Sequence, residues 1–115
     1  MFNFEKLEVY CKAIEFITEI YSITKKFPKE ELFGITNQFR RAAISIPLNI
    51  AEGSSRSKKE FSHFIKISIG SVYECIPLLE ISKKEGYLNE KDYENIYNKC
   101  NRIAAMLNAL KNSLR

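Results

Sequence analysis

Residues 89–115 read NEKDYENIYNKCNRIAAMLNALKNSLR and place an apolar side chain at every third or fourth position without interruption. The series is Tyr93, Ile96, Cys100, Ile103, Leu107, Leu110 and Leu114. This spacing puts the apolar residues on one face of an α-helix. Asn89, with Asp92 three residues later, suits the cap of its first turn. The segment predicts an amphipathic helix that needs other helices to cover its apolar face.

The preceding segment, from Ser57 to Gly86, predicts a second helix with an unusual apolar distribution. Ser57-Lys58-Lys59-Glu60 is a capping box for its start, and Gly86 suits the position just past its end. Its apolar residues point nearly all round the axis: Phe61, Phe64, Ile65, Ile67, Ile69, Val72, Tyr73, Ile76, Leu78, Leu79 and Ile81. A bundle buries one stripe per helix, so the surplus predicts a subunit interface. The alternative is a central helix half covered by the stems of Lys66 and Lys83.

Two further helices are predicted in the N-terminal half. Apolar residues at heptad spacing indicate a helix from about Phe4 to Lys26, ended by Phe27-Pro28. A doubled apolar stripe on this helix also points to a subunit interface. After Gly34 a similar pattern predicts a helix that stops near Gly53 to Ser55, with a kink near Ala43 to Pro47.

Four helices with short connections predict an all-α, antiparallel up-down-up-down four-helix bundle. The chain has 115 residues, which is the size of one domain, so residues 1–115 are expected to form a single unit. The apolar surplus adds the expectation that the bundle assembles into a homo-oligomer.

Cysteine usage and hydropathy indicate a cytoplasmic protein. Cys11, Cys75 and Cys100 are odd in number and lack a CxxC pair, so we expect three reduced, core-packed thiols. The N-terminal residues lack the pattern of a secretory signal, and no segment approaches the roughly 20 apolar residues of a membrane span.

Positive charge is concentrated between Ile35 and Lys66, where six Lys and Arg face two Glu. The candidate nucleic-acid-binding residues are Arg40, Arg41, Arg56, Lys58 and Lys59. The start of the helix after Ser57 adds partial positive charge and free amides, so phosphate could dock there. Intramolecular ion pairs in a solvated loop would explain the same cluster.

Polar residues interrupt the apolar pattern of the two central helices. They are Ser45, Asn49, Glu52, Ser71 and Glu74. Their spacing places each set on one helix face, where a hydrogen-bonded structural network with Arg41 is the favoured interpretation. General acid or base catalysis by the carboxylates is the alternative.

Catalytic patterns are few. His63 is the single histidine, so a Ser-His-Asp triad has one possible base, and no GxSxG elbow occurs. Glu60 and His63 match the Glu-x-x-His spacing of di-iron bundles, but the pattern occurs once and Glu60 already suits a capping role. We therefore expect no enzyme activity, no metal and no cofactor.

The run QFRRAAISIPLNIAEGSSR, residues 38–56, closely resembles the signature of the 23S rRNA intervening-sequence proteins, also called S23 ribosomal proteins. Further matches are Phe27-Pro28 with Gly34, Gly70-Ser71 with Glu74, Gly86-Tyr87-Leu88, and Met106-Leu107. The resemblance covers almost the whole chain. It implies a bacterial four-helix bundle that assembles as a ring-like pentamer, with a presumed role in binding RNA.

The accessory variability determinant of diversity-generating retroelements is similar in fold and assembly, which implies that a nucleic-acid enzyme such as a reverse transcriptase could be a partner. Arg40, Arg41 and Arg56 match the family's Arg positions, and Asn49, Glu52 and Glu74 match its polar ones. Lys58 and Lys59 are added from local charge. Pro77 departs from the family pattern and predicts a kink near Tyr73 that would alter subunit geometry.

The leading hypothesis from sequence is a non-enzymatic oligomer that binds RNA or another nucleic acid. A protein-interaction scaffold or accessory factor for a nucleic-acid enzyme is the second, and a metal enzyme built on Glu60 and His63 is the third.

Overall fold

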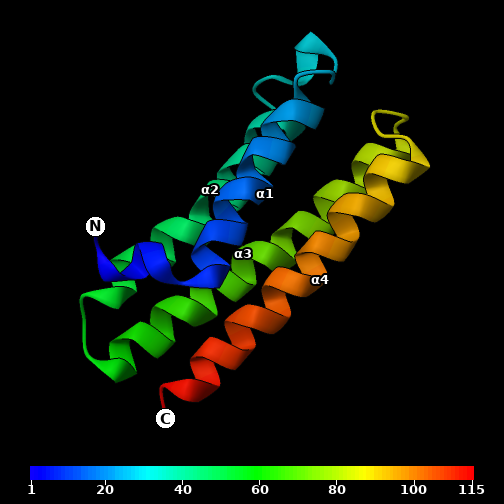
Figure 1. Cartoon of the computed structure of the whole chain (residues 1–115). Helices are drawn as coiled ribbons and strands as arrows, with labels where there is room; N and C mark the ends of the chain where they lie inside the picture. The colour runs from blue at the N-terminus through cyan, green and yellow to red at the C-terminus, as the bar shows by residue number, and fades with distance from the viewer.

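Four α-helices make up most of the computed structural model, which describes residues 1–115 (Figure 1). They are α1 (Glu8–Thr24), α2 (Ile35–Ser54), α3 (Lys58–Lys84) and α4 (Glu90–Ser113). Two short 3-10 helices, η1 (Asn3–Lys6) and η2 (Lys29–Glu31), precede α1 and α2. The all-α, four-helix prediction is confirmed.

Each helix contacts two neighbours, as expected for an up-down bundle. α2 packs against α1 and α3, and α4 packs against α3 and α1, with the most extensive contact between α2 and α3. Successive helices run in opposite directions, and both chain termini lie at the end of the bundle where α2 connects to α3 (Figure 1). The opposite end holds the α1–α2 and α3–α4 connections.

The core consists of one apolar stripe from each helix. The largest fully buried side chains are Phe16 and Ile20 of α1, Phe39, Ile46 and Ile50 of α2, Ile65, Val72, Cys75 and Leu79 of α3, and Ile96, Cys100 and Leu107 of α4. The stripe predicted from residues 89–115 is therefore the inward face of α4. Several large apolar residues stay outside, including Leu48, Ile67, Tyr73 and Ile81.

Local signals set the ends of α3 and α4 as predicted. The Ser57 hydroxyl accepts a hydrogen bond from the Glu60 amide at 3.2 Å, and Asn89 Oδ1 accepts one from the Asp92 amide at 2.7 Å. After α3 the amide of Tyr87 donates to the Ser82 carbonyl at 2.8 Å, while Gly86 adopts a φ of 78°. This closing pattern needs a left-handed residue, which glycine supplies without strain.

The start of the first predicted helix differs in the structure. The first helix is broken at Leu7, whose backbone is extended (ψ 129°), and this break separates η1 from α1 and lets Phe4 pack edge-on against Tyr10 at 5.1 Å. α3 is continuous through Pro77, so the proline does not end the helix, and the kink near Tyr73 stays a prediction. Pro77 has no amide hydrogen to donate to the Tyr73 carbonyl. Both residues are exposed, so water can donate a hydrogen bond to that carbonyl instead.

The cysteine prediction is wrong for one residue. Cys75 and Cys100 are buried free thiols, but Cys11 is exposed because it lies on the outer side of α1, near η1. A hydrogen bond with the neighbouring Cys100 thiol, together with burial, raises the pKa of Cys75. Separately, none of the helices combines the length and apolar character needed to cross a membrane.

Candidate functional site

Arg40 is held against α1 and contributes to the packing of two helices. Its Nε donates a hydrogen bond to Thr24 Oγ1 at 2.9 Å, and its guanidinium carbon lies 4.4 Å from the centre of the Tyr21 ring. Thr24 is buried and in turn donates to the Ile20 carbonyl at 2.6 Å. The charge of Arg40 is thus placed between α1 and α2, and the residue is half-buried.

Arg56 is neutralised by two carboxylates. It pairs with Glu52 at 3.2 Å and with Glu60 at 3.5 Å, and its guanidinium carbon lies 5.0 Å from the centre of the Phe64 ring. The hydrogen bond from the Ser57 hydroxyl, helped by Arg56, lowers the pKa of Glu60. Glu60 therefore stays ionised, and Arg56 links the end of α2 to the start of α3.

Lys58 and Lys59 lie in the first turn of α3, are exposed and form no ion pair. An open hollow of about 1010 Å³ lies beside them. The other basic groups along it are Lys66 and Arg115, and Glu60 and His63 also line it. We call Lys58, Lys59, Lys66 and Arg115 the basic end. The positive end of the α3 dipole adds to its potential.

Lys66 and Arg115 were not predicted as site residues. Lys66 follows Lys59 by seven positions, so helical spacing alone could have placed the two on one face. Arg115 lines the hollow because α4 ends beside the start of α3, which only the fold shows.

The five predicted network residues separate into two groups. Ser71 Oγ donates to Ser45 Oγ at 2.8 Å, and Asn49 Nδ2 donates to Ser45 Oγ at 3.0 Å and to the Ser45 carbonyl at 2.8 Å. Glu52 instead pairs with Arg56, and Glu74 is exposed without an ion pair. The structure thus joins the three uncharged members across α2 and α3.

Arg41 is exposed and forms no ion pair, so it lies outside this hydrogen-bonded group. It sits where two adjoining hollows of about 570 and 510 Å³ share a border on the outer side of α2 and α3. We call this surface the α2–α3 groove. Its larger hollow is lined by Glu74 and by the apolar residues Leu78 and Ile81. Its smaller hollow is lined by Glu52 and Leu48.

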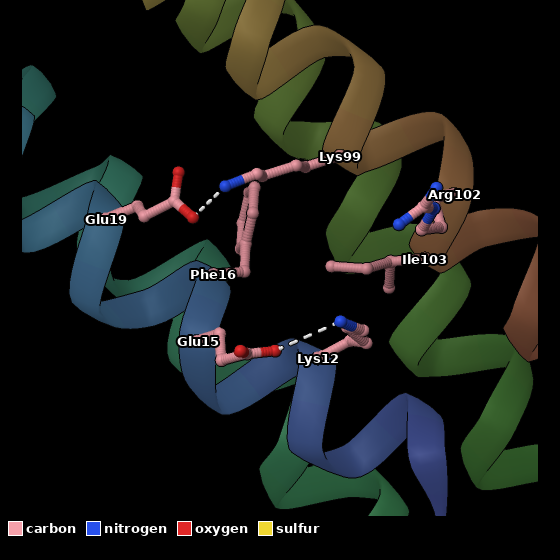
Figure 2. Close-up of a pocket in the computed structure, with 7 residues that line it drawn as sticks. All are labelled: Lys12, Glu15, Phe16, Glu19, Lys99, Arg102 and Ile103. Atoms are coloured by element: carbon pink, nitrogen blue, oxygen red, sulfur yellow. Dashed lines mark hydrogen bonds and ion pairs between the residues drawn. The ribbon is translucent and has the colours of Figure 1, made fainter.

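A smaller pocket of about 110 Å³ lies between α1 and α4 (Figure 2). Phe16 and Ile103 form its apolar part. Glu19 accepts from Lys99, and also from Asn95 at 3.2 Å, while Lys12 pairs with Glu15 at 3.5 Å. The guanidinium of Arg102 reaches towards the space between the helices in Figure 2. Of these contacts, those of Glu19 with Lys99 and Asn95 link α1 to α4, whereas the Lys12–Glu15 pair lies within α1.

No group of three or more His, Cys, Asp and Glu side chains comes together as a metal site would require. Both oxygens of Glu60 are engaged, one with Ser57 and the other with Arg56. The ring centre of His63 lies 5.9 Å from the ring centre of Phe64. Glu60 thus belongs to the cap of α3, and His63 is an exposed imidazole one turn further along the helix.

The geometry defines a class of protein: a four-helix bundle whose candidate sites are an exposed basic end and an open groove. Residues 5–109 match the family model described as 23S rRNA-intervening sequence protein. The chain therefore belongs to the 23S rRNA-intervening sequence protein family, as its motifs predict.

A solved structure supports this membership. The chain is similar to a protein of unknown function from the S23 ribosomal protein family of Bacteroides thetaiotaomicron, whose crystal structure was determined at 1.70 Å resolution. The TM-score is 0.83 and the sequence identity is 26%, over 90% of this chain and 95% of that one. No curated protein matches the chain.

Proposed function

We propose that this chain is a non-enzymatic, cytoplasmic protein that binds RNA or another nucleic acid through the basic end and works as a homo-oligomer. One observation carries the binding proposal: Lys58 and Lys59 are exposed without an ion-pair partner, and Lys66 and Arg115 lie beside them around one hollow. Ammonium and guanidinium groups on an open surface contact phosphates and carry little sequence information.

The five cations first predicted have different roles in this proposal, and one of them, Arg41, belongs to the α2–α3 groove. Lys58 and Lys59 face the nucleic acid, whereas Arg40 and Arg56 are occupied by Thr24, Glu52 and Glu60. The matching family name, with its reference to rRNA, is consistent with a nucleic-acid ligand.

Binding can be tested by fluorescence anisotropy with a structured RNA and a sequence-matched duplex DNA over a salt series. The test variant is Lys58→Ala/Lys59→Ala/Lys66→Ala. Its matched control, Lys25→Ala/Lys26→Ala/Lys29→Ala, removes three exposed lysines near the α1–α2 connection at the other end of the bundle. Log affinity should fall steeply with log salt, and the slope should flatten by about 0.9 for each phosphate that the test variant no longer binds.

Equal losses in the two variants would show a general charge effect and refute the basic end as the site. An absence of binding by the wild type at low salt would refute nucleic-acid binding altogether and move the search to protein partners, including a nucleic-acid enzyme.

The α2–α3 groove supports self-assembly with a second copy of the chain as its occupant. Leu48 is 61% exposed and Ile81 50% exposed, although both lie on helices that are otherwise well packed. Arg41 and Glu74 carry opposite charges without ion-pair partners, so a neighbouring copy can pair them across the contact. The ring-like pentamer implied by the family resemblance is the form of assembly that we propose.

Light scattering tests this assembly. Leu48→Asp and Ile81→Asp should each lower the particle mass towards the 13.4 kDa of one chain. Phe33→Asp is the control because Phe33 is 91% exposed and lies outside the groove. A wild-type protein that is monomeric at all concentrations would contradict the proposal.

A further inference from the structure

A straight row of exposed residues runs along the outer side of α3, starting at the basic end. Its members follow one another at helical spacings of four, three, four and three: Lys59, His63, Lys66, Gly70 and Tyr73. Because α3 is continuous over this range, the five positions form one ridge about 21 Å long at 1.5 Å per residue. We call this row the α3 ridge.

Cationic and aromatic side chains alternate on the α3 ridge. Lys59 and Lys66 are exposed without ion pairs, and the imidazole of His63 lies between them in sequence. Tyr73 is 63% exposed, an unusual exposure for a large aromatic side chain on an otherwise well-packed helix. A side chain built at Gly70 would meet nothing within 4 Å, so the ridge is open between Lys66 and Tyr73.

This alternation of cationic and aromatic side chains suits single-stranded nucleic acid better than a duplex. A single strand offers phosphates to cations and the flat faces of its unpaired bases to aromatic rings. A duplex hides those faces in its stack and presents mainly phosphates. Tyr73 lies too far along α3 to serve the hollow at the basic end, and it does not line that hollow.

We infer that the α3 ridge binds single-stranded nucleic acid, with phosphates on Lys59 and Lys66 and a base stacked on Tyr73. The inference rests on the proposed nucleic-acid binding and adds the strandedness of the ligand. At the stacked spacing of about 3.4 Å, the ridge spans on the order of six nucleotides. Its path ends near Tyr73 because the following Glu80 is an exposed anion that repels phosphate, while the neighbouring Glu74 lines the α2–α3 groove proposed as the subunit contact.

The test compares a single-stranded RNA of 12 nucleotides with a 12-base-pair RNA duplex, both measured by anisotropy at one salt concentration. Tyr73→Ala should weaken single-strand binding by at least about five-fold and leave duplex binding unchanged, whereas Tyr73→Phe should retain the wild-type affinity. Phe33→Ala is the matched control, since it removes another exposed aromatic ring outside the ridge. Both positions are exposed, so the variants should fold normally.

A second readout uses the absence of tryptophan from the chain. Tyr73→Trp introduces a single reporter, and stacking of a base on its indole should quench the fluorescence when single-stranded RNA is added. Phe33→Trp should show no quenching. Quenching at both positions, or at neither, would overturn the stacking contact.

The outcomes separate this inference from the proposed function. Salt-dependent binding that requires the basic-end lysines, but is equal for single strand and duplex and insensitive to Tyr73→Ala, overturns the inference alone. Loss of all binding by the wild type overturns both.

Discussion

The α2–α3 interface is closed by small side chains, whereas the α1–α4 interface is bridged by long charged ones. Gly53 of α2 packs directly on Phe64, and Ser68 of α3 donates a hydrogen bond to the Ile46 carbonyl of α2 at 2.8 Å. At the α1–α4 interface, Glu19 reaches across to Lys99 and a pocket remains below it (Figure 2). The two interfaces therefore differ in how closely the helix backbones approach.

This difference follows from the chemistry of the contacts. A hydroxyl that bonds the main chain of a neighbouring helix fixes the distance between two backbones, and a glycine permits that distance. Long ionic side chains span a wider gap and adapt to it. A mutation that adds side-chain atoms to the α2–α3 interface should therefore destabilise the protein. At the α1–α4 interface, destabilisation should come mainly from mutations that remove apolar contacts.

The largest effect is expected at the apolar part of the α1–α4 interface. Phe16 is 1% exposed, and Phe16→Ala should lower the free energy of unfolding by about 3–5 kcal/mol because it leaves a cavity that joins the existing pocket. Urea denaturation measures this change. Phe16→Leu, which keeps most of the volume, should cost clearly less; equal costs would mean that the pocket collapses around either side chain.

Next in size is Gly53→Ala in the α2–α3 interface. A Cβ at this position would lie 2.7 Å from Phe64 Cβ and 2.9 Å from Phe61 Cδ1, so the helices must shift. Overpacking should destabilise the bundle by about 1–3 kcal/mol. Thermal and urea denaturation of the same variant measure the loss.

Gly70→Ala is its matched control, because Gly70 also lies in a helix but a Cβ added there would have no neighbour within 4 Å. At this position alanine should stabilise the protein by up to about 1 kcal/mol through its higher helix propensity. The same sign for both variants would contradict the close approach of α2 and α3.

Helix positions could be predicted from sequence because their signals act within one or two turns. Ser57 with Glu60, Gly86 and Asn89 each bond residues close to them in the chain. The stripe from Tyr93 to Leu114 likewise identifies the inward face of α4 without knowledge of its neighbours. The break at Leu7 could not be predicted in this way, because it depends on Phe4 packing against Tyr10 and on contacts between η1 and α2.

The candidate site was only partly accessible to sequence reasoning. Lys58 and Lys59 follow from local charge, and the spacing to Lys66 could have extended the cluster. The engagement of Arg40 depends on Thr24, sixteen residues away on another helix. A count of charges treats Arg40 and Lys59 alike. Packing of α1 against α2 partly buries Arg40, whereas Lys59 stays exposed.

A smaller effect is expected from Ser68→Ala. The variant loses the buried hydrogen bond to the Ile46 carbonyl, which links α3 to α2, and this should cost about 1 kcal/mol in unfolding free energy. Ser82→Ala is the control, since Ser82 is equally buried but bonds only the Leu78 carbonyl of its own helix at 2.7 Å. If urea denaturation gives the same cost for both, the contact between helices contributes nothing beyond burial.

The smallest effect, and the one that separates the two interfaces by mechanism, is the coupling between Glu19 and Lys99. A double-mutant cycle with Glu19→Ala and Lys99→Ala should give about 0.2–1 kcal/mol, because both side chains remain partly exposed. Raising the salt concentration should reduce this coupling, since ions screen exposed charges. The corresponding cycle with Ser45→Ala and Ser71→Ala, which removes the uncharged hydrogen bond of 2.8 Å between α2 and α3, should keep its value in high salt. Salt-independent coupling at Glu19 and Lys99 would mean that their contact is carried by packing of the aliphatic stems, and the ionic description of the α1–α4 interface would then be wrong.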